Sequence, residues 1–146
     1  MSSASSRNGC TFCAIVEGAP AHRVLDEPAF LGFLDTRPVF KGHVLLVPRE
    51  HVETLLDLPD SLREPFLDAL QRLARAMETG LGAQGSFVAV NNRVSQSVPH
   101  LHAHVIPRTR GDGLRGFFWP RRKYTDAAEA ESYAERVRAA LRRPTT

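Results

Sequence analysis

The chain has 146 residues, of which 42% are hydrophobic and 24% are charged, and its formal net charge is +3 at pH 7. This length fits a single domain with one core, and the composition is ordinary for a globular protein. The longest apolar run, Val44 to Val47, is far too short to cross a bilayer, so we expect no transmembrane helix and no membrane partner. Residues 1–8 are serine-rich and lack an apolar segment, which predicts a disordered leader on a cytoplasmic protein and not a secretion signal.

The first part of the chain predicts three strands. Two short apolar segments, 24–25 and 30–34, are separated by a proline-containing turn and predict two paired strands. The segment 43–47 is rich in apolar residues and predicts a third strand, which Pro48 ends.

A helical pattern follows, because apolar residues recur there at spacings of four, four, three and four and so form one stripe. We expect Asp60 or Ser61 to cap the start of this helix, and Gly80 and Gly82 to mark its end. The stripe consists of Leu62, Phe66, Leu70, Leu73 and Met77.

The second part of the chain predicts two more strands, 86–91 and roughly 100–106, the latter closed by Pro107. Thr125 or Asp126 can cap a terminal helix with one apolar face. The order of strands, helix, strands and helix predicts an α+β fold with an antiparallel sheet. The apolar face of the terminal helix consists of Ala130, Tyr133, Val137 and Leu141.

Three histidines at alternate positions, His100, His102 and His104, are the most informative feature of the sequence. Because side chains alternate between the faces of a strand, the three imidazoles share one face and the apolar residues between them share the other. A purely structural role is the first alternative, although aligned imidazoles make a poor core. A catalytic metal site is the second, but such sites usually add a carboxylate, and none lies between Pro99 and Arg110.

The segment from Ser95 to Ile106 contains the pattern H-φ-H-φ-H-φ-φ, where φ is apolar, and resembles the signature of the histidine triad family. Further stretches are similar to the same family and occur in the expected order. These are Cys10-Thr11-Phe12-Cys13, Gln96-Ser97-Val98 and the region from Phe33-Leu34-Asp35 to Val47-Pro48-Arg49-Glu50-His51. The resemblance runs from about Cys10 to Asp112 and implies a five-stranded antiparallel sheet with one long helix and a C-terminal helix.

The resemblance implies a hydrolase that acts on the α-phosphate of purine nucleotide conjugates. His102 is the implied nucleophile, which forms a nucleotidyl-histidine that water then hydrolyses to a nucleoside monophosphate. The carbonyl of His100 is the implied acceptor that fixes the tautomer of His102. His104 and Ser97 would stabilise phosphoryl oxygens or help the leaving group. Transferase relatives tend to carry Gln in place of His104, so this histidine favours hydrolysis.

The resemblance also implies contacts with the nucleoside. Asp35 is the implied acceptor for both ribose hydroxyls, and a simple turn residue is its alternative. Leu25 and Phe33 are candidates for the purine slot, although apolar strand residues are more often core.

Two amides are implied near the phosphate, Asn91 and Gln96. The loop between them is short for the family, so Asn92 is an alternative to Asn91. Ser95 stands where the family commonly has Gly, so the backbone path there can differ.

Cys10 and Cys13 have a spacing that is tight for a structural disulfide, and in a reducing cytosol it indicates a metal or redox pair. Resemblance to Cys-x-x-Cys members of the family implies that His51 and His100 complete a zinc site. Such a closed site would be structural and would leave no position for a reacting water. Two buried thiols without a metal are the alternative.

Residues 108–124 combine cationic side chains with Phe117, Phe118 and Trp119. Such mixtures are typical of single-strand nucleic-acid binders, so a nucleic-acid-binding module is the main rival function. Because that function leaves the three histidines without a role, we expect no nucleic-acid partner. The other interpretations are a cover over the site and packing on the sheet or on a dimer partner. A nucleotide sensor without turnover is a third functional class.

The branch of the family stays open. Val105 to Arg108, with Gly111-Asp112, is similar to the dinucleoside-polyphosphate-cleaving branch, and the Cys-x-Phe-Cys start is similar to the phosphoramidate-cleaving branch. We divide the chain into a leader (1–8), a histidine triad domain (9–112) and a loop with a C-terminal helix packed on that domain (113–146). The family implies a homodimer paired through the long helix and a sheet edge.

Overall fold

The computed structural model describes residues 7–114 and 121–142. The chain divides into two compact units, one up to Asp112 and one from Gly113 onward, and each is described by itself. Within the described ranges no helix is both long and apolar enough to span a bilayer. Residues 1–6 of the expected leader and the aromatic residues 117–119 lie outside these ranges.

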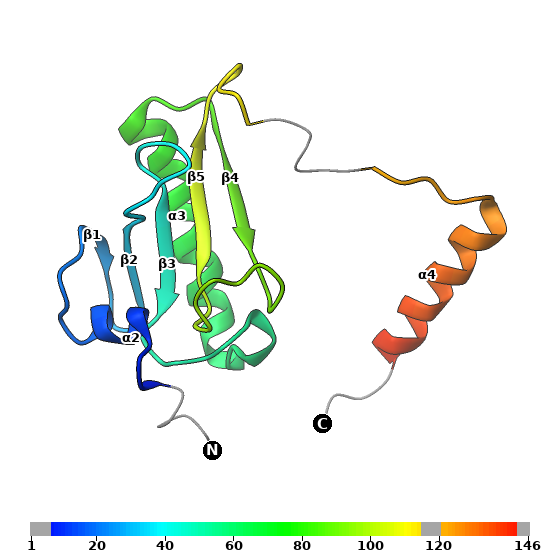
Figure 1. The fold of residues 1–146 in the computed structure, drawn as a ribbon, viewed down its shortest axis with the longest axis horizontal. Coiled ribbons are helices and arrows are strands. Elements are labelled where there is room, and N and C mark those ends of the chain that lie inside the picture. Colours follow the sequence, from blue (N-terminus) through cyan, green and yellow to red (C-terminus); the bar gives the residue numbers. More distant parts are fainter. Residues whose placement is uncertain (1–6, 115–120, 143–146) are drawn as a thin grey trace. The chain divides into compact units, whose positions relative to one another are not determined.

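A five-stranded sheet forms the centre of the first unit, with strand order β1-β2-β3-β5-β4 and every neighbouring pair antiparallel (Figure 1). The strands are β1 (Arg23–Asp26), β2 (Phe30–Leu34), β3 (Val44–Pro48), β4 (Gly85–Val90) and β5 (Ala103–Arg108). The helices are α2 (Thr11–Val16) and α3 (Arg63–Leu81), with short 3-10 turns at Leu55–Asp57 and Asp60–Leu62. The α+β fold predicted from the order of elements is confirmed.

The two faces of the sheet carry different cores. Helix α3 covers one face (Figure 1), where Phe66, Leu73 and Met77 pack against Leu46 and Val105 of the sheet. This burial follows from the apolar stripe of α3 and from the strand alternation, and it leaves the odd-numbered residues of β3 for the opposite face. The apolar cluster of that opposite face consists of Cys10, Phe12, Cys13, Leu31, Phe33, Leu45 and Val47.

Helix α3 begins later than its expected caps. Asp60 and Ser61 form a 3-10 turn that runs directly into the helix, so the N-cap position falls on Leu62, which has no side-chain cap. The prediction of an Asp60 or Ser61 cap is therefore wrong. The end is as expected, because Gly82 adopts φ 70° and its N–H bonds to the carbonyl of Glu78 at 3.1 Å.

Strand β5 begins at Ala103 and contains Pro107, so the prediction that Pro107 closes a strand begun at His100 is wrong. The backbone before Ala103 leaves the sheet because the Leu101 N–H bonds to the carbonyl of Val52 at 2.8 Å. A proline is tolerated inside β5 because the pairing with β3 extends only from Ala103 to Val105, and Pro107 therefore has a strand on one side only.

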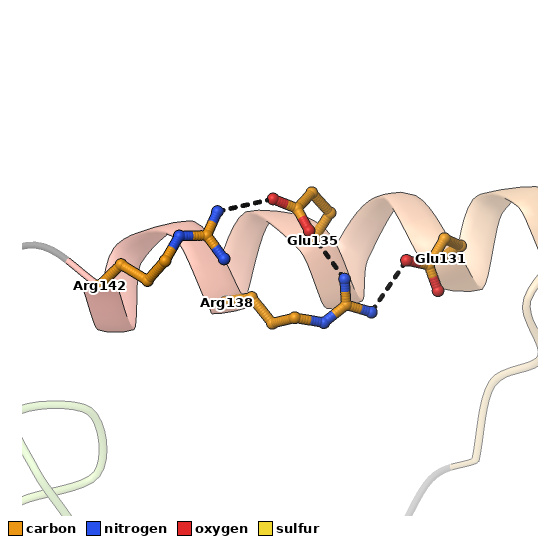
Figure 2. Close-up of polar contacts among 4 residues, drawn as sticks. All are labelled: Glu131, Glu135, Arg138 and Arg142. Atoms are coloured by element: carbon orange, nitrogen blue, oxygen red, sulfur yellow. Dashed lines mark hydrogen bonds and ion pairs between the residues drawn. The ribbon is translucent and has the colours of Figure 1, made fainter.

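The second unit contains α4 (Ala127–Arg142), which has the predicted start: the Glu129 N–H bonds to the Asp126 carboxylate at 2.9 Å. One side of α4 carries a chain of ion pairs (Figure 2). Arg138 contacts both Glu131 and Glu135 at 2.8 and 2.7 Å, and Arg142 contacts Glu135 at 2.9 Å. The Glu135–Arg138 pair, at a spacing of three residues, is of the kind that supports a helix by about 0.2–0.5 kcal/mol. That α4 packs on the first unit stays a prediction.

Candidate active site and metal-ligand cluster

A cavity of about 1030 Å³ lies on the face of the sheet that carries α2. Its lining combines apolar side chains from α2, β2 and β3 with polar side chains at the ends of β2 and at the start of β5. The apolar members include Phe12, Ile15, Phe33 and Leu45, and the polar members include Asp35, Ser97, His102 and His104. The apolar part of the lining can therefore contact a ring of a ligand, while the polar part can bind a charged group of the same ligand.

The His102 side chain is 4% exposed and lines this cavity. Its Nδ1 lies 2.8 Å from the carbonyl oxygen of His100. Because a carbonyl oxygen only accepts hydrogen bonds, Nδ1 carries the proton and Nε2 keeps its lone pair. The Phe12 ring packs against the imidazole edge to face, with centroids 5.0 Å apart. The ring is therefore held in the tautomer that a nucleophile requires.

His104 also lines the cavity, and its Nδ1 lies 3.0 Å from Nε2 of His43. Burial, together with the charges of His102 and His43, lowers the pKa of His104 to about 4. Burial also lowers the pKa of His43, against the opposing influence of the Asp35 carboxylate. Both rings are therefore neutral near pH 7.

Asp35 follows β2 directly and presents its carboxylate to the cavity. Its Oδ1 accepts the Arg37 N–H at 2.9 Å, while its Oδ2 lies 3.7 Å from His43 Nδ1. The carboxylate therefore stabilises its own turn and still has acceptor capacity for a ligand. Ser97 is exposed at the cavity wall, where its hydroxyl can reach a ligand.

A second polar group lies behind His102. The side chains of Cys10, Cys13, His51 and His100 bring one ligand atom each within 4.8 Å of all the others. Cys13 Sγ lies 3.1 Å from His51 Nδ1, and His100 Nδ1 lies 3.5 Å from both sulfur atoms. Three segments that are distant in the sequence therefore meet at this cluster. They are the C-x-x-C turn at the start of α2, the segment before β5, and His51, three positions after β3.

These four residues fit a zinc ion. In a tetrahedral site with bonds of about 2.0–2.3 Å, neighbouring ligand atoms are roughly 3.5 Å apart, which is close to the separations here. His100 Nε2 donates to the Pro48 carbonyl at 2.8 Å, so its Nδ1 lone pair faces the sulfur atoms. Burial lowers the pKa of His100 to about 4 and raises that of the Cys13 thiol to about 11, so the ring has the ligand form and the thiol would release a proton to a metal.

Comparison with known proteins identifies the family. The HIT domain model matches residues 17–111. A HIT-like protein of Mycobacterium tuberculosis is 38% identical over 108 residues, which cover 72% of this chain and 75% of that protein. The chain belongs to the HIT domain family. The adenosine 5'-monophosphoramidase of Schizosaccharomyces pombe is a HIT relative that is 33% identical over 114 residues, covering 76% of this chain and 83% of that protein.

A solved relative has the same fold. The crystal structure of a Zn-bound histidine triad family protein from Mycobacterium smegmatis is 36% identical and superposes with a TM-score of 0.70, over 92% of this chain and 99% of that chain. The five-stranded sheet of the present chain is therefore the HIT fold, as its sequence predicted.

One predicted substrate residue of this HIT protein lies on the wrong face. Leu25 is buried in the core beside α3, and the cavity lining does not include it. A bulge between Arg23 and Leu25 shifts the register of β1 against β2, so Leu25 pairs with Gly32 on the α3 side. Phe33, on the other side of β2, does line the cavity. The assignment of Leu25 to the purine slot is therefore corrected to a core role.

The loop of this HIT protein between β4 and the histidines is fastened by its own amides. Gln96 donates to the Glu53 carbonyl at 2.7 Å and accepts the Arg93 N–H at 2.8 Å, while Asn92 accepts the Leu55 N–H at 2.8 Å. None of Asn91, Asn92 and Gln96 lines the cavity, so their contact with phosphate stays a prediction. Ser95 adopts φ 62°, the left-handed conformation that glycine favours.

No sequence pattern assigned a role to His43 or to Phe12. His43 has the same parity as Leu45 and Val47, so strand alternation alone places it on the site face of a strand next to the triad. Phe12 lies between the two cysteines, and its ring contacts both His100 and His102. The position of each residue in the sequence could have indicated its role. His43 directly precedes the strand next to the triad, and Phe12 lies between the two cysteines.

Proposed function

We propose that this HIT protein is a nucleotidyl hydrolase that acts on the α-phosphate of purine nucleotide conjugates through a nucleotidyl-histidine intermediate. The observation that carries the proposal is the His102 ring, whose Nδ1 is bound to the His100 carbonyl while the ring lines the cavity. The lone pair of Nε2 is then available to attack a phosphorus atom.

The reaction follows in two displacements. In the first, a bond forms between His102 Nε2 and the α-phosphorus, the bond from phosphorus to the leaving group breaks, and the leaving group takes up a proton. In the second, water attacks phosphorus, the phosphorus–nitrogen bond breaks and a nucleoside monophosphate leaves. His104 and the Ser97 hydroxyl lie where they can donate hydrogen bonds to the phosphate or to the leaving group. Covalent catalysis divides one difficult step into two easier ones.

The cavity lining supports a nucleoside as the constant part of the substrate. Phe12 and Phe33 are in edge-to-face contact, with centroids 5.5 Å apart, and give the cavity an aromatic wall that suits a purine. Asp35 supplies an acceptor for ribose hydroxyls. The monophosphoramidase relative from Schizosaccharomyces pombe favours a phosphoramidate as the first substrate to examine.

We also propose that Cys10, Cys13, His51 and His100 hold a structural zinc ion. The donor set, its spacing and the Zn-bound relative from Mycobacterium smegmatis support this proposal. When bound, the zinc would fasten α2 to the segment before β5, and four protein ligands would leave it no position for water. The chemistry at phosphorus would remain with the histidines.

A homodimer and a cytoplasmic location complete the proposal. In the described part of the chain, β4 has a neighbouring strand on one side only, so its outer edge can pair with a second copy. Both cysteines are free, which suits a reducing compartment. Light scattering at micromolar concentration should give about twice the chain mass of 16.2 kDa, and a mass equal to it would contradict the dimer.

The experiment compares wild type, His102→Ala and Gln71→Ala on adenosine phosphoramidate and on a dinucleoside polyphosphate, with the nucleoside monophosphate as the measured product. Gln71 is the control, because it is an exposed residue of α3 that does not line the cavity. We expect His102→Ala to lower the rate by at least about 10³-fold while it still binds the monophosphate, and Gln71→Ala to change the rate by less than about threefold.

Acid-quenched wild-type protein should carry the nucleotidyl group on the peptide that contains His102. Turnover by His102→Ala at the wild-type rate would contradict the mechanism. Salt-sensitive binding of single-stranded DNA without turnover of any nucleotide would instead favour the nucleic-acid-binding alternative.

A further inference from the structure

The contact between His43 and His104 bears on which nitrogen of each ring carries the proton. Nε2 of His43 and Nδ1 of His104 lie 3.0 Å apart. A hydrogen bond between two neutral imidazoles contains one proton, which belongs to one of the two facing nitrogens. The direction of this bond decides which atom His104 presents to the cavity.

A backbone group decides the direction. The Val39 N–H donates to Nδ1 of His43 at 3.1 Å, so this nitrogen must be the acceptor with the lone pair. The neutral His43 ring then carries its proton on Nε2 and donates it toward Nδ1 of His104. The Asp35 carboxylate is 3.7 Å from His43 Nδ1, which is beyond hydrogen-bond distance, so it does not draw a proton to that atom.

We propose that His43 is a positioning residue that fixes the tautomer of His104, so that His104 presents its Nε2–H as a hydrogen-bond donor to the substrate phosphate. The inference rests on the proposed function for the identity of the substrate, and on the hydrogen-bond chain from Val39 through His43 to His104 for the tautomer. His104 lines the cavity, and among the described residues the only hydrogen-bond partner of its imidazole is His43.

The result is a complementary pair of rings. His102 has its proton on Nδ1, bound to the His100 carbonyl, and offers a lone pair. His104, whose ring centroid is 5.1 Å from that of His102, has its proton on Nε2 and offers a donor. One ring can therefore attack phosphorus while the other stabilises a phosphoryl oxygen or the departing atom. Burial keeps the His43 and His104 rings neutral, so the tautomers persist near pH 7.

Nitrogen-15 NMR of the imidazole rings tests the tautomer directly in the wild-type protein. Long-range proton–nitrogen correlations distinguish a ring protonated on Nδ1 from one protonated on Nε2, and the spectrum of His104→Gln assigns the His104 signals. We expect both His43 and His104 to be protonated on Nε2 and His102 on Nδ1. Protonation of His104 on Nδ1 would overturn the inference. This readout needs no substrate, so it stands even when every substrate of the proposed function fails.

A kinetic cycle tests whether His43 acts through His104. His43→Leu removes the donor, and we expect kcat to fall on the order of tenfold to a hundredfold with KM within about threefold, because the donor to the phosphate is no longer oriented. His43→Gln keeps an N–H donor and should recover most of kcat. In a His104→Ala background, His43→Leu should change kcat by less than about twofold.

If the losses in kcat caused by His43→Leu and by His104→Ala multiply in the double variant, His43 acts independently of His104, and this result would overturn the inference. Equal losses in His43→Leu and His43→Gln would do the same, because packing and not the donor would then be responsible. Melting temperatures of the variants, measured in the same samples, identify a variant that has lost its fold, and for such a variant the wild-type NMR result decides.

Discussion

Two groups of side chains flank His102, and each brings its possible ligand atoms within 4.8 Å of one another: Cys10, Cys13, His51 and His100 on one side, and Asp35, His43 and His104 on the other. By proximity alone, both are candidate metal sites. Their hydrogen bonds separate them. In the first group, Nε2 of His100 donates to the Pro48 carbonyl, so the lone pair of His100 Nδ1 faces the sulfur atoms. In the second, a proton already lies between the two rings.

The two groups are equally compact, so their hydrogen-bond partners are the feature that separates a candidate metal site from a donor–acceptor chain. A metal needs several lone pairs directed at one point. A chain in which donors and acceptors alternate, as from the Val39 N–H to His43 and on to His104, has no lone pair to spare at its inner positions. This difference supports our proposals that the first group binds zinc and that the second orients His104.

Among the changes that distinguish the two groups, removal of the thiols should have the largest effect, on zinc content and on melting temperature. Protein purified without chelator should hold about one zinc per chain, and the Cys10→Ser/Cys13→Ser variant should hold almost none. Its melting temperature should fall on the order of 10 °C, because the binding free energy of a structural zinc adds to the stability of the fold. Elemental analysis and thermal unfolding measure the two quantities.

The matched control is His43→Gln, which alters the second group and should keep the full zinc content. Two zinc ions per wild-type chain, or a zinc content that the serine substitutions leave unchanged, would remove the distinction between the groups.

The pH dependence of stability should report the buried, neutral state of His104. In the unfolded chain a histidine titrates near pH 6.5, whereas burial and the charges of His102 and His43 lower the pKa of His104 to about 4 in the native protein. Between these values the unfolded state binds a proton that the native state does not. The stabilisation is therefore present above pH 6.5 and is lost as the pH falls toward 4, by at most about 1.4 kcal/mol per pH unit for this group.

Urea unfolding of wild type and His104→Gln between pH 7 and 4.5 measures this contribution as the difference between two slopes. Acid also releases metal, but both proteins carry the same metal ligands, so the difference isolates His104. Identical slopes would show that His104 titrates normally in the native protein.

The smallest effect should come from Asp35→Asn. The asparagine oxygen can still accept the Arg37 N–H, so the free energy of unfolding should change by less than about 0.5 kcal/mol. Affinity for a nucleoside monophosphate should fall about fivefold, because a charged acceptor for the ribose is lost. Calorimetric titration measures the affinity.

Asp60→Asn is the control for Asp35→Asn, because Asp60 is an exposed aspartate that pairs with Arg63. Its affinity for the nucleotide should not change. A loss of zinc in Asp35→Asn would contradict the assignment of Asp35 to the second group.

Much of the fold follows from patterns within single elements. The apolar stripe of α3, the strand character of β3 and the Asp126 cap of α4 each depend on residues close together in the sequence, and each was predicted. The wrong cap at Asp60 or Ser61 is a local error, whereas two other errors occurred where distant backbone groups intervene. Pro107 lies inside β5 because β3 is shorter than β5, and Leu25 faces α3 because of a bulge against β2. Neither the length of a partner strand nor a bulge is visible in one segment.

The site shows the same division. The sequence by itself predicted a common face for His100, His102 and His104, because alternation is a property of the extended backbone, and of the three only His104 lies within β5. The family pattern then pointed to the cysteines and Asp35 as their companions. It could not assign the three rings their different states, since all three are the same residue.

Tertiary structure decided those states by what it placed opposite each ring. Pro48 and the thiols lie beside His100, the preceding carbonyl lies beside His102, and His43 lies beside His104. A neutral imidazole has one proton and one lone pair, and the partner at one nitrogen determines what the other nitrogen offers. In our proposals a metal ligand, a nucleophile and a hydrogen-bond donor therefore arise from one repeated residue, because contacts between remote segments fix the position of each proton.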